Sequence, residues 1–251
     1  MSSFSTADSA HMARALELAE RGRYSARPNP MVGCVIVRNN QVIGEGWHQR
    51  AGDAHAEINA LEAAGDDAAG STVYVTLEPC AHHGKTPPCA EALVSAGVGK
   101  VVVAMQDPND SVAGRGLDFL QAAGIRVETG LMEASAAALN QGFVSRMTQA
   151  RPFVRLKIAA SIDGAIAMKN GDSQWITGPP ARDDVQRLRA GSGAVMTGIG
   201  TVLADDPSLN VRSKDLAAAV AQPMRVVLDS QLRMPLAATM LTLPGTSLVC
   251  F

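Results

Sequence analysis

The residues best suited to chemistry are two cysteines in the stretch PCAHHGKTPPC, residues 79–89. Cys80 follows the apolar run STVYVTLEP, and Cys89 follows two prolines and opens CAEALVSAG, a run that favours a helix. A helix N-terminus lowers the pKa of a thiol. Two nearby thiolates repel each other, and a divalent cation such as zinc removes that repulsion. Because disulfides are rare in cytosolic proteins, the pair predicts a metal site.

A third ligand and a proton carrier are offered by GDAHAEINAL, earlier in the chain. We expect His55 and Glu57 in the first turn of a helix for which Asp53 is the N-cap. One imidazole and two sulfurs are three protein ligands, the number typical of a catalytic zinc, and they leave the fourth position to water. The metal lowers the pKa of that water toward about 7. Glu57 can then take its proton and return it to a leaving amine, which is hydrolytic deamination of an amino-substituted ring.

Other interpretations of these residues stay open. The two cysteines could be unrelated buried residues, as we expect Cys34 and Cys250 to be because both lie in apolar runs. A structural zinc site would need a fourth protein ligand, which His82 or His83 could supply, and it would leave Glu57 without a task. Without that role, the two histidines line the pocket or lie in a solvated loop.

The elements that must position these residues alternate regularly over residues 1–147. A first helix stops at Gly22, and CVIVRNNQVIGEG predicts two strands joined at Asn39 and Asn40. HAEINALEAAG predicts a helix that ends at Gly65. Strands then follow in STVYVTLEP, KVVVAMQDP and IRVETG, and helices in CAEALVSAG, GLDFLQAAG and EASAAALNQGFVSRM. This alternation predicts parallel pairing with helices on both faces, and a ligand site at the carboxyl ends of the strands.

The regular alternation of predicted strands and helices is interrupted at TQARP, residues 148–152, which indicates a domain boundary. We place one domain over residues 1–148 and a second over residues 149–251. The apolar runs FVRLKIAAS, AVMTG, MRVVLDS and TSLVCF predict the strands of the second domain. The chain stops at Phe251 within such a run, and an unpaired apolar strand is a liability. We therefore expect the second domain to be incomplete at its C-terminus.

Composition excludes several classes of function. The chain has 251 residues, 47% hydrophobic and 4% aromatic, with a net charge of −2. This weak charge gives no case for nucleic acid or acidic membranes as partners. No apolar run is long enough for a signal peptide or a membrane span. We expect a cytoplasmic protein that acts on a small molecule. Its Ala-rich helices could pack in a homo-oligomer, although no seam in the sequence is diagnostic.

The motifs resemble a known family. His-Ala-Glu followed by Pro-Cys-x₈-Cys resembles the zinc-dependent cytidine-deaminase-like superfamily, in which the two cysteines are usually separated by two residues. The longer loop EPCAHHGKTPPC, with RPNPMVGCVIV upstream and MQDPN and VAGRGLDFLQAAGI downstream, is similar to the bifunctional deaminase–reductase of riboflavin biosynthesis. KIAASIDG, SQWITG and VLADDPSLNVR are similar to the second domain of that family. The resemblance covers essentially the whole chain.

For the first domain, the resemblance implies a cytidine-deaminase-like three-layer α/β/α fold with a mixed sheet. In that family this domain deaminates 2,5-diamino-6-(5-phosphoribosylamino)pyrimidin-4-one and releases ammonia. Carried over, one zinc ion per chain is bound by His55, Cys80 and Cys89, and Glu57 is the proton shuttle. The substrate contacts are Asn29 and His48. On local pattern alone, Asn29 is equally a turn residue and His48 a solvated strand end.

For the second domain, the resemblance implies a dihydrofolate-reductase-like α/β fold that uses NADPH to reduce the ribose to a ribityl chain. The cofactor contacts would be Ala159, Trp175, Thr201, Asp205 and Ser230. The substrate contacts would be Ser173, Arg189, Leu209 and Arg212. The two arginines suit a ribose phosphate, because guanidinium groups bind phosphate bidentately. Without the resemblance, Arg189 is a solvated helix residue and GIGT, residues 198–201, is an ordinary strand-to-helix turn. Lys157 is a further candidate to face the reductase substrate.

The family's reductase domain continues beyond the point where this chain ends, and a Gly-rich segment over the cofactor phosphates belongs to that part. We therefore expect this chain to deaminate and to reduce poorly or not at all.

A nucleobase or transfer-RNA deaminase with an appended domain is the enzymatic alternative, and it would need a basic stripe with stacking aromatics. A structural-zinc interaction module is the non-enzymatic alternative, and it predicts four protein ligands and unfolding when the metal is removed.

Overall fold

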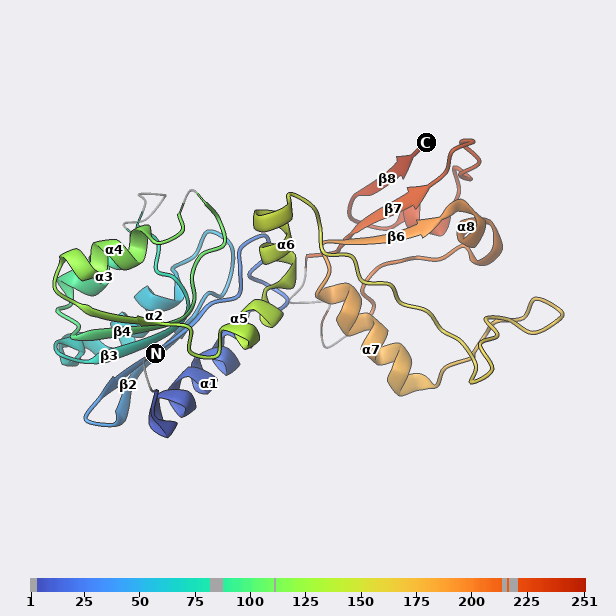
Figure 1. Ribbon diagram of the computed structural model, residues 1–251. Coiled ribbons are helices and arrows are strands. Elements are labelled where there is room, and N and C mark those ends of the chain that lie inside the picture. Colours follow the sequence, from blue (N-terminus) through green and yellow to red (C-terminus); the bar gives the residue numbers. More distant parts are fainter. Residues whose placement is uncertain (1–3, 82–87, 111, 214–215, 217–220) are drawn as a thin grey trace. The chain divides into compact units, whose positions relative to one another are not determined.

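The chain forms two compact units in the computed structural model, Met1–Val154 and Arg155–Phe251 (Figure 1). The structure describes residues 4–81, 88–110, 112–213, 216 and 221–251. The boundary that we predicted between residues 148 and 149 falls within helix α6 (Gln141–Gln149) of the first unit. Within the described ranges, no helix is both long and apolar enough to cross a membrane.

A five-stranded mixed sheet, in the order β2-β1-β3-β4-β5, forms the centre of the first unit. β1 (Gly33–Arg38) pairs antiparallel with β2 (Gln41–Trp47) and with β3 (Thr72–Leu77). β4 (Lys100–Met105) and β5 (Arg126–Thr129) extend the sheet in parallel. Asn39 and Asn40 adopt positive φ between β1 and β2, as predicted for a tight hairpin turn. Pairing is therefore parallel only from β3 onward.

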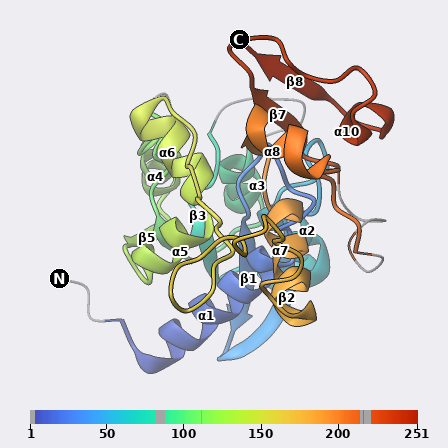
Figure 2. The same cartoon turned by 90° about the vertical axis from the view of Figure 1, so that its right-hand side faces the viewer.

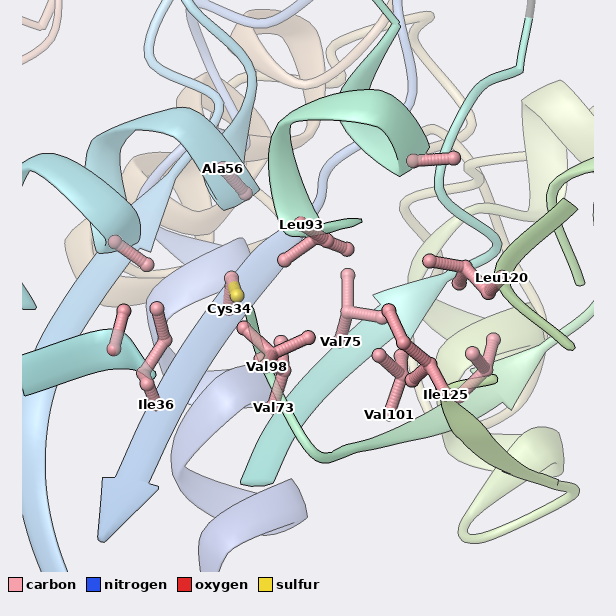
Figure 3. Packing of buried hydrophobic residues seen from close by; sticks show 14 of the residues in the cluster. Cys34, Ile36, Ala56, Val73, Val75, Leu93, Val98, Val101, Leu120 and Ile125 are labelled. Carbon is pink, nitrogen blue, oxygen red and sulfur yellow. The ribbon is translucent and has the colours of Figure 1, made fainter. Parts of the chain in front are cut away.

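Helices cover both faces of this sheet. On one face lie α2 (Ala56–Ala64), α3 (Cys89–Ser95) and α4 (Arg115–Ala122), whose apolar residues pack on alternate positions of β1, β3 and β4 (Figure 3). On the other face lie α1 (Thr6–Glu20) and α5 (Glu133–Leu139). Since both faces are covered, the inner strands β1, β3 and β4 are mostly apolar and buried along most of their length. The predicted three-layer α/β/α fold with a mixed sheet is confirmed.

The packing of α2 on β2 depends on glycines. A Cβ atom on Gly46 would lie 2.3 Å from the carbonyl oxygen of Ala56 and 2.5 Å from the nitrogen of Ala60. Gly44 is equally close to the same helix. At the far end, Gly65 has φ 55° and ends α2, as predicted, before the 3₁₀ turn η1 (Gly65–Ala68). The close approach fixes the start of α2 over the sheet.

One predicted helix of the first unit is wrong in its extent. The pattern predicts a single helix over EASAAALNQGFVSRM, whereas the structure has α5 and α6 separated by Asn140, with φ −112° and ψ 31°. The physical reason is tertiary. The side chain of Asn140 hydrogen-bonds the backbone of Met31, and the helix breaks where that contact is made.

The second unit holds a parallel three-stranded sheet, in the order β6-β7-β8. Its strands are β6 (Ala194–Gly198), β7 (Met224–Leu228) and β8 (Ser247–Cys250). α8 (Ile199–Asp205) follows β6 and contacts it, and α10 (Thr239–Thr242) lies near β8 in Figure 2. Val202 and Met240 from these helices form a core with Val227. α7 (Pro179–Ala190) begins with prolines, which suit the first helical turn.

A strand predicted for FVRLKIAAS is wrong. These residues have no regular secondary structure, and Val154 and Leu156 are 80% and 82% exposed. A strand is stabilised by pairing with a neighbour, and no strand in the described part of the chain pairs with this segment. Cys34 is fully buried in the core, as expected, whereas Cys250 in β8 is only half-buried.

Candidate metal centre

The side chains of His55, Cys80 and Cys89 converge beyond the carboxyl end of β3. Nδ1 of His55 lies 3.2 Å from Sγ of Cys89 and 3.6 Å from Sγ of Cys80. The three potential ligand atoms all lie within 4.8 Å of one another. Cys80 follows β3, and Cys89 is the first residue of α3. Residues from three separate elements thus form one compact group of metal-ligating atoms.

The predicted N-cap of α2 is wrong. His55, and not Asp53, is the N-cap, with extended φ −74° and ψ 165° and no hydrogen bond from its side chain to the helix. The reason is the direction of the imidazole, which reaches the two sulfurs instead of the free N–H groups of the first turn. A candidate metal ligand therefore takes the N-cap position of α2, two residues after the predicted cap.

The donor set fits zinc. Tetrahedral zinc, with bonds of about 2.3 Å to sulfur and about 2.05 Å to nitrogen, separates the two kinds of ligand atom by roughly 3.6 Å. The observed nitrogen–sulfur distances of 3.2 and 3.6 Å are close to this value. Among the described residues the group has three members. His82 and His83, considered above as a fourth ligand, lie outside the described residues.

The two thiols differ in their electrostatics. The Cys89 thiol, the His55 ring and the Cys89 backbone N–H all donate toward the sulfur of Cys80, and they lower the pKa of the Cys80 thiol well below its usual range against the opposing effect of burial. The pKa of Cys89 is raised, because its thiol donates to Cys80 and is buried. The pair thus favours one thiolate, and a bound cation would displace the second proton.

Glu57 lies beside these ligands in the first turn of α2. Its side chain is only 3% exposed and hydrogen-bonds Cys89. Burial raises the pKa of Glu57 to about 7, and the negative charge at Cys80 acts in the same direction. A buried carboxyl group with a near-neutral pKa can both accept and donate a proton.

Asn29 and His48, the predicted substrate contacts, are brought to the same place. Nδ2 of Asn29 lies 3.0 Å from Nε2 of His48, and Nδ1 of His48 lies 3.2 Å from the carbonyl oxygen of Ala54. His48 therefore donates from Nδ1 and accepts at Nε2. Its ring meets that of His55 edge-on, with centroids 5.5 Å apart. His48 is buried, which lowers its pKa and contradicts the alternative of a solvated strand end.

Sequence reasoning missed Glu78, which precedes Pro79 and Cys80. Its carboxylate is 4% exposed and accepts three backbone hydrogen bonds, from Asp107 at 3.1 Å, Gly114 at 3.0 Å and Gly116 at 2.9 Å. These bonds attach the loop after β4 and the first turn of α4 to the turn that carries Cys80. The sequence signal is its place, directly after the apolar run STVYVTL and before Pro79 and Cys80.

In the second unit, the structure brings together the predicted substrate arginines. Arg189 of α7 donates to the carbonyl oxygen of Asn210 at 3.1 Å, and Arg212 donates to the side chains of Ser208 and Asn210. Burial and the nearby charge of Arg212 lower the pKa of Arg189. Arg189 is thus half-buried rather than a solvated helix residue. Two close guanidinium groups, with no ion pair to either in the described ranges, suit an anion.

The other predicted residues of the second unit are more scattered. Leu209 is buried beside the arginines, with φ 50°. Thr201 and Asp205 are exposed on α8, and Ser230 is exposed just after β7. Ala159, Ser173 and Trp175 lie in residues without regular structure, and the described contacts do not join them to the arginine pair. The Arg182 guanidinium lies 4.6 Å from the centroid of the Trp175 ring.

Comparison with known proteins agrees with this arrangement. Residues 5–105 match the family model of the cytidine and deoxycytidylate deaminase zinc-binding region, and residues 152–250 match that of the RibD C-terminal domain. Fold and site thus define an enzyme with a zinc-type deaminase domain and a reductase-type domain. The chain belongs to the RibD family of riboflavin biosynthesis proteins, which confirms the resemblance seen in the sequence.

Several RibD proteins are similar to this chain over nearly its whole length. The riboflavin biosynthesis protein RibD of Escherichia coli (strain K12) is 54% identical over 247 residues, which cover 95% of this chain and 67% of that protein. RibD of Haemophilus influenzae is 53% identical over 242 residues, which cover 93% and 65%. The structure of Acinetobacter baumannii RibD, form 1, has a TM-score of 0.93 at 58% identity and covers 97% of this chain and 69% of that one. The chain therefore spans about two thirds of the length of these relatives.

A fourth relative carries both activities in its name. It is a diaminohydroxyphosphoribosylaminopyrimidine deaminase/5-amino-6-(5-phosphoribosylamino)uracil reductase from Thermotoga maritima. Its structure has a TM-score of 0.83 at 42% identity and covers 90% of this chain and 64% of that one.

Proposed function

We propose that the first unit catalyses the hydrolytic deamination of 2,5-diamino-6-(5-phosphoribosylamino)pyrimidin-4-one, with one zinc ion held by His55, Cys80 and Cys89. The observation that carries this proposal is the convergence of one imidazole and two sulfurs beside the buried carboxyl group of Glu57. The substrate is supported by the family, since the Thermotoga maritima relative is named as a deaminase of this kind of pyrimidine.

The chain's own residues divide the reaction between them. Zinc, when bound, would lower the pKa of water toward about 7 and so supply a nucleophile at neutral pH. Glu57 is placed to accept a proton from the attacking water and to return it to the ring amino group, which would leave as ammonia while the ring carbon gains a carbonyl oxygen. Asn29 and His48, joined by their hydrogen bond, orient the pyrimidine. Burial of Glu57 and His48 excludes bulk water from the proton path.

For the second unit, the proposal is NADPH-dependent reduction of the ribose. The close guanidinium groups of Arg189 and Arg212 support it, because they suit the phosphate of a phosphoribosyl group. The other proposed substrate contacts are Ser173 and Leu209. The proposed cofactor contacts are Ala159, Trp175, Thr201, Asp205 and Ser230. Separate assays of ammonia release and of NADPH oxidation test the two units independently.

The variant Glu57→Gln tests the first proposal. We expect zinc to stay bound near one ion per chain, while ammonia release falls by about 10²–10⁴-fold because the proton carrier is lost. Metal analysis and an ammonia assay measure the two effects. Glu62→Gln, on an exposed position of the same helix, is the matched control and should keep full activity. Full turnover by Glu57→Gln would contradict the proposal and favour a structural metal.

A further inference from the structure

Asn140 joins the break between α5 and α6 to the loop that carries Asn29. Its side chain is 5% exposed. Oδ1 accepts a hydrogen bond from the backbone N–H of Met31 at 2.8 Å, and Nδ2 donates to the carbonyl oxygen of Met31 at 2.8 Å. One primary amide thus satisfies both backbone groups of a residue that precedes β1 and has no strand neighbour. Residue 31 is held as firmly as a paired strand residue would be.

The contact continues directly to the site. Met31 is two residues from Asn29, whose side chain hydrogen-bonds Nε2 of His48 at 3.0 Å. On the other side of Met31, the carbonyl oxygen of Val32 accepts the backbone N–H of His48 at 2.9 Å. The backbone at residue 31 therefore lies between two points at which this loop meets His48. We expect a shift at residue 31 to change the distance between the Asn29 amide and the His48 ring.

We infer that Asn140 is a positioning residue of the deaminase site, which acts through Met31 on the hydrogen-bonded pair Asn29 and His48. This inference rests on the proposed deaminase function for its kinetic consequence, although not for the geometry. No other uncharged side chain of this size offers an acceptor and a donor in one plane. Aspartate keeps the size but replaces the Nδ2 donor with an acceptor that faces the carbonyl oxygen of Met31. Asn140→Asp therefore removes one bond and adds a repulsion.

Steady-state kinetics of ammonia release give the first test. Because misplacement of a substrate contact weakens binding before chemistry, we expect Asn140→Asp to raise KM by about tenfold or more, with a smaller change in kcat and unchanged zinc content. Asn29→Ala should raise KM as well. In the Asn29→Ala background, Asn140→Asp should have little further effect on KM, because the group on which it acts is gone. Additive effects of the two substitutions would overturn the inference.

The control is a variant that loses a different buried contact of the same unit. Tyr74→Phe removes the hydrogen bond from the Tyr74 hydroxyl to Oδ1 of Asp8, 2.7 Å long, on the other side of β3 from the metal group. It should lower the midpoint of thermal unfolding and leave KM unchanged. An equal rise in KM for Tyr74→Phe would show that general destabilisation is sufficient, and it would also overturn the inference.

A spectroscopic readout separates this inference from the proposed function. In ¹H–¹⁵N NMR spectra of the histidine rings, Nε2 of His48 should move in Asn140→Asp in the direction that it moves in Asn29→Ala, and stay in place in Tyr74→Phe. If the wild-type chain released no ammonia, the proposed function would fail while this measurement still decided the inference. An unchanged Nε2 signal would overturn it. If Asn140→Asp does not fold, Asn140→Gln is the second variant. It keeps the amide donor and acceptor but places them one methylene further from the backbone, and it should move the His48 Nε2 signal in the same direction.

Discussion

At the scale of single residues, Glu78 shows how a buried carboxylate can organise the turn before Cys80, a proposed metal ligand. Its carboxylate accepts three backbone N–H groups, two from the loop after β4 and one from the first turn of α4, and the chain then passes through Pro79 to Cys80. Gly116 in that turn of α4 approaches so closely that a Cβ atom there would lie 2.0 Å from the carbonyl oxygen of Pro79. The position of Cys80 therefore depends on Glu78 although the carboxylate is not one of the three ligands.

We expect Glu78→Gln to weaken both the fold and the metal site. A glutamine would have to direct its Nε2 donor at one of the N–H groups that the carboxylate now accepts, which costs about 1–3 kcal/mol for a buried donor left without an acceptor. Displacement of Cys80 should lower zinc affinity by roughly 10–100-fold, as for other residues that support ligands. Urea unfolding and competition with a chelator measure the two effects. Glu62→Gln is the exposed control, and equal behaviour of the two variants would contradict the role.

The residues of the candidate metal centre could be predicted from the sequence, although their partners lie 25 and 34 residues away. His55, Glu57, Cys80 and Cys89 stand at the start of helices or just after a strand, where short-range pattern shows which groups reach a common edge of the sheet. Asn140 could not be predicted, because its partner is 109 residues away and the surrounding run resembles one continuous helix. Local pattern contains no information on such a contact.

At the scale of elements, features set by local backbone conformation could likewise be predicted, whereas a strand that needs a distant partner could not. The hairpin turn at Asn39 and Asn40 and the end of α2 at Gly65 were predictable because backbone conformation alone determines them. The strand expected over residues 153–161 depended on a partner strand, which local sequence cannot specify. The contact of α2 with β2 leaves no room for a side chain on the strand, and so it requires glycine at positions 44 and 46. The same contact positions His55 and Glu57 at the start of α2.

Gly46→Ala tests this contact. The new methyl group would meet the backbone of α2 at Ala56 and Ala60, which cannot move as a side-chain tip could. We expect a loss of about 1–3 kcal/mol in unfolding free energy from overpacking, together with weaker zinc binding because the first turn of α2 moves. Chemical denaturation and zinc titration measure these changes.

The matched control for Gly46→Ala is Gly142→Ala in α6, where a Cβ atom would meet nothing within 4 Å. Removing a helical glycine there should stabilise the chain by about 0.5–1 kcal/mol. If Gly46→Ala lowered the unfolding free energy no more than Gly142→Ala does, the position of α2 would not depend on its close approach to Gly46.

At the scale of the whole molecule, each unit has its own hydrophobic core. Two clusters on opposite faces of the five-stranded sheet stabilise the first unit, and a smaller cluster around Val227 and Met240 stabilises the second. The metal-ligating group belongs wholly to the first unit and the arginine pair wholly to the second. Ligand binding stabilises only the cooperative unit that holds the site. Metal removal should therefore affect one unit alone.

Scanning calorimetry of the full chain tests this separation. We expect two transitions, which core variants assign: Leu93→Ala should destabilise the first unit by about 2–5 kcal/mol, and Val227→Ala should lower only the other transition. Chelation of zinc should lower the transition assigned by Leu93→Ala and leave the second in place. For a unit of this size, each kcal/mol of lost stability lowers the midpoint by about 2–4 °C. A single transition that responds to all three changes would show one cooperative molecule instead, since two independent cores cannot unfold at one shared midpoint under every perturbation.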